Sequence, residues 1–309
     1  MQTILGANGQ IGSELALALK TDFTENIRLV SRNPKKVNDT DELISANLLN
    51  AFETQNAIAG SEIVYFTAGL PIDTAMWIDQ FPIMMRNVID ACEIHNAKLV
   101  YFDNTYMYAQ TTDLLTEETP FEPYGDKGKV RGLIANMLLD AMREKRVDAI
   151  ICRAPEFYGP GKTQSITNTT VLDNLRAGKP AKVFISDDTL RTLIFTPDAS
   201  RAMALLGNTP DAYGQTWHLP CDDNRLSYKQ LITTASNILE SNYKYTVLTK
   251  WQLKLISLVN KTVKETLELL PRYKVDNIFI SDKFKTRFPD FKVTSYKEGL
   301  QKTLLETHE

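Results

Sequence analysis

The sequence of 309 residues contains few of the residue types that build metal sites and disulfide frameworks. Cysteine and histidine occur three times each, at positions far apart in the chain. An odd and scattered set of cysteines makes no disulfide pattern and is typical of a reducing compartment. Widely separated histidines and cysteines also lack the spacing of a zinc motif. We therefore expect no metal ion, and a cytoplasmic location.

The sequence also lacks an excess of charge of one sign and a long apolar run. Its 35 basic and 38 acidic residues give a formal net charge of −3, which is no electrostatic footprint for nucleic acid. No apolar segment approaches the ~20 residues that cross a bilayer. Segment 250–270 has apolar residues at helical spacing beside Trp251 and several lysines, but such helices more often cover a cleft or pack in a core than lie on a membrane. We expect neither a nucleic-acid nor a membrane partner.

Strands that are almost entirely apolar alternate with helices over the first half of the chain. Strands are predicted at 3–7, 27–32, 62–69, 98–104 and 148–155, and helices at 10–20, 79–95 and 129–145. Apolar strands separated by helices indicate a parallel sheet that is covered on both faces. Because crossovers between parallel strands are right-handed, the pattern predicts a Rossmann-type, doubly wound α/β fold.

The alternation loosens after about residue 160, where shorter strands and polar helices follow without a low-complexity linker or a repeat. We expect residues 1–160, with returning segments near 190–220, to form the Rossmann domain. The remainder of 161–309 is expected to form a smaller α/β substrate lobe. Ligands of doubly wound folds bind at the carboxyl ends of the strands, so the lobe should pack there.

Three glycines recur at three-residue intervals in "GANGQIG", between the first predicted strand and helix. Gly6 allows a tight turn, Gly9 lets backbone approach a pyrophosphate, and Gly12 lets the helix pack closely on the sheet. The helix N-terminus adds free N–H groups and a positive dipole end. A glycine-rich turn without a ligand is the alternative, but the strand–turn–helix context favours a dinucleotide site. Further contacts to the cofactor are expected from Asn8, Gln10 and Ile11.

The end of the second predicted strand indicates which dinucleotide to expect. NAD-binding chains carry an acidic residue there, about 20 positions beyond the glycines, which binds the ribose 2′-hydroxyl. This sequence reads "LVSRNPKK", with Arg32 and no carboxylate. A guanidinium makes charge-assisted, bidentate hydrogen bonds to a phosphate, so NADP(H) is favoured over NAD(H). A solvated loop arginine is the alternative for Arg32.

The glycine motif and four later segments together resemble the extended short-chain dehydrogenase/reductases, which include nucleotide-sugar epimerases and dehydratases. The later segments are "YMYA" (106–109), "RAPEFYGPG" (153–161), "RTLIFTPDASRA" (191–202) and "TSYKEGLQKTL" (294–304), in the family's order. The resemblance spans nearly the whole chain. It implies hydride transfer with a small carbonyl or sugar-like substrate, and it leaves a homodimer open. It also implies cofactor contacts from Ala68, Gly69, Asn87, Ala154, Pro155 and Phe157.

The sequence departs from this family at the residues that carry its chemistry. The family has Ser or Thr four residues before the tyrosine at the Tyr108 position, and a Tyr-x-x-x-Lys pair on the next helix. Here Asn104 and Pro123 stand where the hydroxyl residue and the tyrosine are expected, if Lys127 is the lysine. Tyr124 lies three residues before Lys127, so the pair would share a helix face. We expect Tyr124 to exchange the proton and Lys127 to bind the nicotinamide ribose; a cleft-capping tyrosine and a surface lysine are the alternatives.

Two other polar residues near strand ends are candidates for chemistry. Asn104 can hydrogen-bond a substrate carbonyl, and Glu156 can act as a general base if burial raises its pKa. An equally weighted alternative is a structural salt bridge that joins Asp103 or Glu156 to Arg153 or Arg191. Loss of the Tyr-x-x-x-Lys pair also leaves a second function open, a non-catalytic NAD(P)-binding sensor or regulatory protein.

Overall fold

The computed structural model describes residues 1–161 and 163–305; residues 162 and 306–309 of the expected lobe lie outside the described residues. Within the described part, seven strands form one sheet in the order β3-β2-β1-β4-β5-β6-β11, and all neighbours pair in parallel. The predicted Rossmann-type fold is confirmed. The strands are β1 Gln2–Leu5, β2 Ile27–Ser31, β3 Glu42–Ser45, β4 Ile63–Phe66, β5 Lys98–Asp103, β6 Ala149–Arg153 and β11 Gln215–His218.

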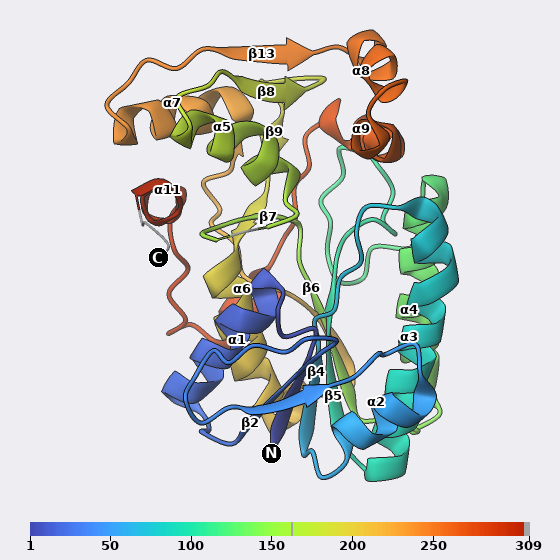
Figure 1. Ribbon diagram of the computed structural model, residues 1–309. Coiled ribbons are helices and arrows are strands. Elements are labelled where there is room, and N and C mark those ends of the chain that lie inside the picture. Colours follow the sequence, from blue (N-terminus) through green and yellow to red (C-terminus); the bar gives the residue numbers. More distant parts are fainter. Residues whose placement is uncertain (162, 306–309) are drawn as a thin grey trace.

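Helices cover both faces of this sheet (Figure 1). Helices α1 (Gln10–Asp22) and α6 (Thr196–Gly207) lie on one face, and α2 (Ala51–Ile58), α3 (Thr74–His95) and α4 (Gly125–Arg143) lie on the other. One apolar cluster includes Leu15 of α1 and Met203 of α6, and a second includes Met85 of α3 and Leu138 of α4. Because helices bury both faces, the central strands are apolar almost throughout.

The sequence pattern did not predict β3 and α2, and two helices begin earlier than expected. β3 is an edge strand with three of its four residues exposed, so it lacks the apolar run of the central strands. The short helix α2 is capped by the Asn50 side chain, which accepts hydrogen bonds from two first-turn amides. Helix α3 begins at Thr74 rather than residue 79, with Asp73 as its cap, and it continues through Pro82. Helix α4 begins at Gly125 rather than residue 129.

Most of the rest of the chain forms smaller sheets and short helices beyond the carboxyl ends of the central strands, toward the top of Figure 1. A third apolar cluster, which includes Leu175, Val183 and Leu231, forms its core. The exact boundary between this lobe and the sheet domain stays a prediction. Three strand pairs are present: β7 Glu156–Tyr158 with β10 Leu193–Phe195, β8 Ala181–Phe184 with β13 Tyr245–Leu248, and β9 Leu190–Arg191 with β12 Leu226–Ser227. The helical elements of the lobe are η1 Asn168–Leu172, α5 Asp173–Arg176, α7 Tyr228–Ile238, α8 Lys250–Ser257, α9 Lys261–Thr266, η3 Leu267–Tyr273 and α11 Tyr296–Leu305. The short elements η2 Pro210–Ala212 and α10 Asp282–Arg287 instead pack with the sheet domain, because Ala212 and Phe284 belong to its first apolar cluster.

Candidate functional site

Gly6 ends β1 in a turn that no other residue type fits. Its φ of +91° lies in the region that favours glycine, and its amide donates to the Val30 carbonyl at 2.9 Å. A Cβ at this position would lie 2.6 Å from the backbone nitrogen of Ala68, and still closer to its Cα. The backbone of the loop after β4 therefore runs directly against the glycine loop.

The first turn of α1 is also built for a close approach. A Cβ on Gly12 would lie 2.8 Å from the Cα of Ala7, so the helix packs tightly against the loop that precedes it. Gly9 is the N-cap residue, and no side chain caps this helix. The amides of an uncapped first turn are a binding site for an anionic group. The geometry at Gly6, Gly9 and Gly12 thus fits the pyrophosphate of a dinucleotide.

Asn8 and Arg32 lie at the border between the glycine loop and the loop after β2. The side chain of Asn8 donates to the Asn33 carbonyl at 2.7 Å and accepts from the Lys35 amide at 3.2 Å. Asn8 therefore joins the two loops and holds their relative position. Arg32 directly follows β2 and its side chain is exposed. The structure thus places the exposed Arg32 next in the chain to Asn33, whose carbonyl contacts the glycine loop.

Gln10 connects the glycine loop to the "YGPG" segment far along the chain. Its Nε2 donates to the Pro160 carbonyl, while its Oε1 is buried and has no hydrogen-bond partner among the described residues. The Thr196 hydroxyl, which adjoins Gly159, is likewise buried without a partner there. Buried polar atoms without partners are costly unless a ligand or water satisfies them. These two atoms fit a cofactor that lies between the loop and this segment.

The other residues expected at the cofactor have different surroundings in the fold. Asn87 donates to the Leu48 carbonyl at 2.9 Å, so its side chain joins α3 to the loop after β3. The amide of Ala154 donates to the Asp103 carbonyl, which extends the β5–β6 pairing by one residue. A Cβ on Gly69 would meet nothing within 4 Å. Three further residues expected at the cofactor are buried or half-buried, and their contact with it stays a prediction: Ile11, Pro155 and Phe157.

Lys127 is completely buried at the junction of α4 with the lobe. Its ammonium group lies 2.8 Å from Oε2 of Glu265 and 2.7 Å from Oε1 of Glu268, and it also donates to the hydroxyl of Thr74. Burial would raise the pKa of Glu265, but hydrogen bonds from Lys127 and Thr74 outweigh it and lower the pKa to about 2. Lys127 is therefore not a surface lysine. Tyr124, the N-cap residue of α4, is more than half exposed, so the two side chains do not share one environment.

Glu156 is surrounded by donors from the lobe. Its Oε1 accepts hydrogen bonds from Thr167 at 2.8 Å and from Tyr228 at 3.2 Å, and its Oε2 lies 3.3 Å from the Arg191 guanidinium. The hydroxyl of Tyr273 lies within 3.4 Å of both carboxylate oxygens. The salt-bridge alternative is confirmed for Glu156. These donors engage both carboxylate oxygens, and a role of Glu156 as a general base stays a prediction.

A second buried network begins at Asp103, where β5 ends. Asp103 lies 2.6 Å from Arg131 of α4 and 3.2 Å from Arg153 of β6, so the salt-bridge alternative is confirmed here as well. Arg153 donates to the Tyr108 hydroxyl at 2.7 Å, and that hydroxyl lies 2.8 Å from Nε2 of His218. Burial lowers the pKa of His218 to about 3, so the ring is neutral at physiological pH. This network fixes the segment that follows β5.

Arg272 is a functional candidate that sequence reasoning missed. It is buried, its guanidinium lies 4.5 Å from the Tyr106 ring centroid, and its Nη2 makes a long contact of 3.4 Å to the Thr105 carbonyl. Its Nε has no hydrogen-bond partner, and no carboxylate pairs with it, within residues 1–161 and 163–305. Burial lowers its pKa. In the same loop Asn104 accepts from the Tyr106 amide, so its side-chain oxygen is already engaged. Nothing in the "LPRY" sequence distinguishes Arg272 from a surface arginine.

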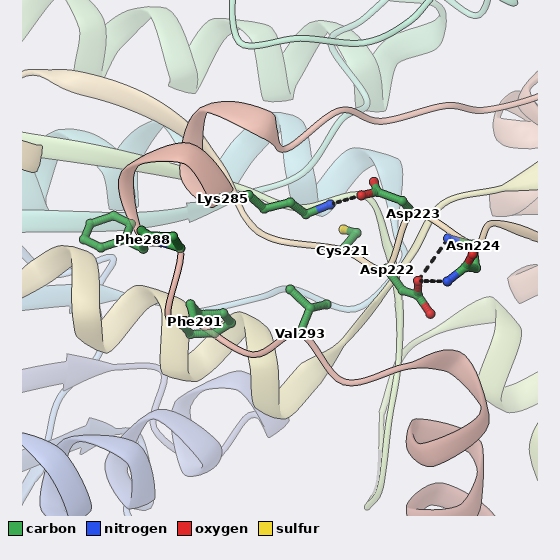
Figure 2. A pocket seen from close by; sticks show the side chains of 9 residues that line it. Cys221, Asp222, Asp223, Asn224, Lys285, Phe288, Phe291 and Val293 are labelled. Carbon is green, nitrogen blue, oxygen red and sulfur yellow. Dashed lines mark hydrogen bonds and ion pairs between the residues drawn. The ribbon is translucent and has the colours of Figure 1, made fainter.

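An open cavity of about 360 Å³ lies between the loop after β11 and the segment after α10 (Figure 2). Two of its charged groups pair with each other, Lys285 and Asp223 at 2.7 Å, and Asp222 accepts a hydrogen bond from the Asn224 amide. The glycine loop contributes nothing to its lining. No three side chains of the His, Cys, Asp and Glu types gather as a metal ion requires, and no helix is long and apolar enough to cross a bilayer, in the described part of the chain.

Comparisons with known proteins agree with this fold. No curated protein matches the sequence at a significant level. UDP-glucuronic acid 4-epimerase from Bacillus cereus, solved with NAD, shares 15% identity with a TM-score of 0.80, covering 98% of this chain and 97% of that chain. UDP-glucose 4-epimerase from Thermus thermophilus, also with NAD, shares 13% identity with a TM-score of 0.78, covering 98% of each chain. A dTDP-glucose 4,6-dehydratase from Bacillus anthracis, with NAD, shares 15% identity with a TM-score of 0.78, covering 98% and 94%.

At these identities the solved structures establish a common fold, and the family is established by sequence. The model of the NAD dependent epimerase/dehydratase family matches residues 3–219, well over half of the chain. The match includes the glycine loop, β5 and the "YGPG" segment, so the resemblance seen in the sequence is confirmed. This chain therefore belongs to the NAD dependent epimerase/dehydratase family.

Proposed function

We propose that the protein binds NADP(H) and is an oxidoreductase or epimerase/dehydratase-type enzyme for a small carbonyl or sugar-like substrate. The observation that carries the proposal is the close approach of the Gly6 turn to Ala68 beneath the uncapped first turn of α1. This arrangement supports a pyrophosphate at the helix N-terminus. The buried oxygens of Gln10 and Thr196, which find no hydrogen-bond partner within residues 1–161 and 163–305, support a cofactor that extends toward the "YGPG" segment. When bound, the nicotinamide would supply the hydride chemistry.

The preference for NADP(H) rests on the residues after β2. Arg32 is exposed beside the glycine loop, and Asn8 holds that loop against the segment 33–35. A guanidinium in this place is suited to a 2′-phosphate and offers no acceptor for a 2′-hydroxyl. The similar structures described above contain NAD, so the preference rests on this chain's own residues.

The substrate is proposed to carry a negative charge. Arg272 is buried beside Tyr106 at the carboxyl end of β5 without a carboxylate partner in the described part of the chain. A buried guanidinium is stabilised when an anionic ligand pairs with it. Of the four residues expected to do chemistry, Lys127, Glu156 and Asn104 are engaged by protein groups, and Tyr124 is exposed at the start of α4. Tyr124 is therefore the proposed proton donor.

The contacts of Lys127 with protein carboxylates favour a second function, a sensor that binds a dinucleotide but catalyses no reaction. Lys127 is neutralised by Glu265 and Glu268, so its ammonium is occupied where the family resemblance expects a ribose ligand. A protein that keeps the cofactor loop but holds its lysine in this way can bind a dinucleotide without acting on a substrate.

The first test is a titration of the purified protein with NADPH and NADH, for the wild type and Arg32→Ala. We expect NADPH to bind at least about tenfold more tightly than NADH, and the variant to lose this preference while NADH affinity is unchanged. Lys36→Ala, which removes a neighbouring exposed lysine, is the matched control. Equal affinities would remove the NADP(H) preference alone, and absence of binding by either dinucleotide would overturn the proposed site.

An activity assay of the wild type and Tyr124→Phe distinguishes the enzyme hypothesis from the sensor hypothesis. If the protein turns over a carbonyl substrate, loss of a proton-transferring hydroxyl should lower kcat by about a hundredfold or more, with NADPH affinity unchanged. A panel of anionic carbonyl and sugar substrates, followed through NADPH oxidation, provides the assay. Turnover that is the same in the variant contradicts the role of Tyr124, and binding without turnover across the panel favours the sensor.

A further inference from the structure

Helix α8 has apolar side chains on both of its faces. Leu253 is buried in the core of the lobe, which satisfies the inner face. Trp251 and Leu255, four residues apart, point away from that core, and Leu258 and Val259 follow in the next turn. These four side chains are between 47% and 90% exposed. The inner side of α8 therefore packs in the core of the lobe, as the sequence predicts for this segment. The exposed apolar residues on its outer side contribute little to that core.

The charged residues of the sequence segment that contains α8 all have one sign, although carboxylates lie nearby in the fold. Residues 241–264 contain five lysines and no aspartate or glutamate, although the whole chain has a net charge of −3. Lys261 pairs with Asp73 of the α3 cap at 2.7 Å. Lys250 and Lys254 are exposed, and no carboxylate in the described part of the chain pairs with either. We call Lys250, Trp251, Lys254, Leu255, Leu258 and Val259 the α8 face.

We propose that the α8 face docks on the surface of an anionic lipid bilayer. Contiguous exposed apolar residues mark interaction sites, and lysines beside a tryptophan and leucines are typical of helices that lie in the headgroup region. The lysines would be attracted to anionic headgroups while the apolar side chains enter the interface. The protein would adsorb without crossing the bilayer. This departs from the expectation, drawn from the sequence, that the protein has no membrane partner.

Charge and position favour a bilayer over a second copy of the chain. A two-fold symmetric dimer through the α8 face would set the lysines of one copy against those of the other, which is unfavourable. Figure 1 shows α8 at the end of the molecule opposite to the N-terminus and β1. A bilayer in contact with α8 would therefore lie against the lobe, far from the end of the sheet at which β1 begins.

The test is sedimentation of the full chain with vesicles of phosphatidylcholine alone, or with one third phosphatidylglycerol. We expect clearly tighter binding to the anionic vesicles and release by high salt. Lys250→Gln/Lys254→Gln should weaken binding about 25-fold, at about fivefold for each lysine near the surface. Leu258→Asp should weaken it at least about tenfold, whereas Ile94→Asp, at an exposed apolar position on α3, should leave it unchanged.

Fluorescence supplies a second readout, because Trp77 and Trp217 are buried and Trp251 is exposed. Anionic vesicles should shift the emission to shorter wavelength in the wild type but not in Trp251→Phe. Several results overturn the proposal: no binding to anionic vesicles at low salt, equal binding to both vesicle types, or equal weakening by Leu258→Asp and Ile94→Asp. A lipid-free dimer that Leu258→Asp converts to monomer would also overturn it, because the face would then be a protein–protein interface.

Discussion

The ammonium group of Lys127 lies 2.7 Å from Oε1 of Glu268, and this contact joins the first turn of α4 to η3 of the lobe. Glu265 of α9 lies almost as close, at 2.8 Å, so one buried cation meets two carboxylates. Thr74 at the start of α3 accepts from the same ammonium. The contact therefore joins α3, α4 and the lobe at a single point.

Replacement of Lys127 by methionine should destabilise the protein by about 3 kcal/mol. The substitution leaves two partly buried carboxylates side by side without a cation, and removal of one partner of a buried pair is costly. Urea unfolding measures the change in the free energy of unfolding. Lys129→Met is the control, because Lys129 pairs with Asp126 on the exposed side of the same helix and should cost under about 0.5 kcal/mol. Equal effects of the two variants would contradict the role given to Lys127.

The stability of the protein should fall in acid partly because of Glu265. Its pKa is lowered from 4.5 to about 2 in the folded protein, so its stabilising effect is present above about pH 4.5 and is lost as the pH falls toward 2. Between about pH 5 and pH 3, the free energy of unfolding should decline more steeply in the wild type than in Glu265→Gln. In a Lys127→Met background the difference in slope should shrink, because the main hydrogen-bond donor is gone. The linkage would be contradicted if the free energy of unfolding had the same pH dependence in the wild type, Glu265→Gln, Lys127→Met and the double variant.

Gly6→Ala should abolish dinucleotide binding and lower the free energy of unfolding by about 2 kcal/mol or more. The added Cβ meets both a positive φ and the backbone of Ala68. Gly60→Ala is a matched control, because Gly60 has a φ of +75° but open space around the added Cβ. It should show the conformational cost alone, with binding unchanged. The idea fails if both variants bind NADPH like the wild type.

Tyr108→Phe should cost about 2 kcal/mol of stability. Its hydroxyl contacts Arg153 and His218 at 2.7 and 2.8 Å, and both partners are buried, so the variant leaves polar atoms unsatisfied. Tyr101→Phe removes a hydroxyl whose one hydrogen-bond contact among the described residues is to Asp103 at 3.5 Å, and it should cost much less. Thermal or urea unfolding of the two variants compares them directly. Similar losses would mean that the Tyr108 network contributes little beyond ring packing.

Much of the fold was predictable because it depends on local patterns. β1, β2, β4, β5 and β6 are buried on both faces, so each is a short apolar run that sequence alone reveals. β3 was not predictable in this way, since an edge strand with exposed residues resembles a loop. The start of α3 was missed because its cap, Asp73, precedes a segment without a clear apolar period.

The candidate site divides along the same line. The sequence by itself determined the glycine loop, the absence of an acidic residue after β2, and the lack of a Tyr-x-x-x-Lys pair, because each depends on residues that are neighbours in the chain. Tertiary structure alone decided that Glu265 and Glu268 bind Lys127, that Glu156 is held by Arg191, and that Arg272 has no carboxylate partner among the described residues. The outward orientation of Trp251 was settled there too. The physical reason is that the charge balance and burial of these side chains depend on partners more than thirty residues away in the chain. A local sequence pattern does not predict which distant residues come into contact.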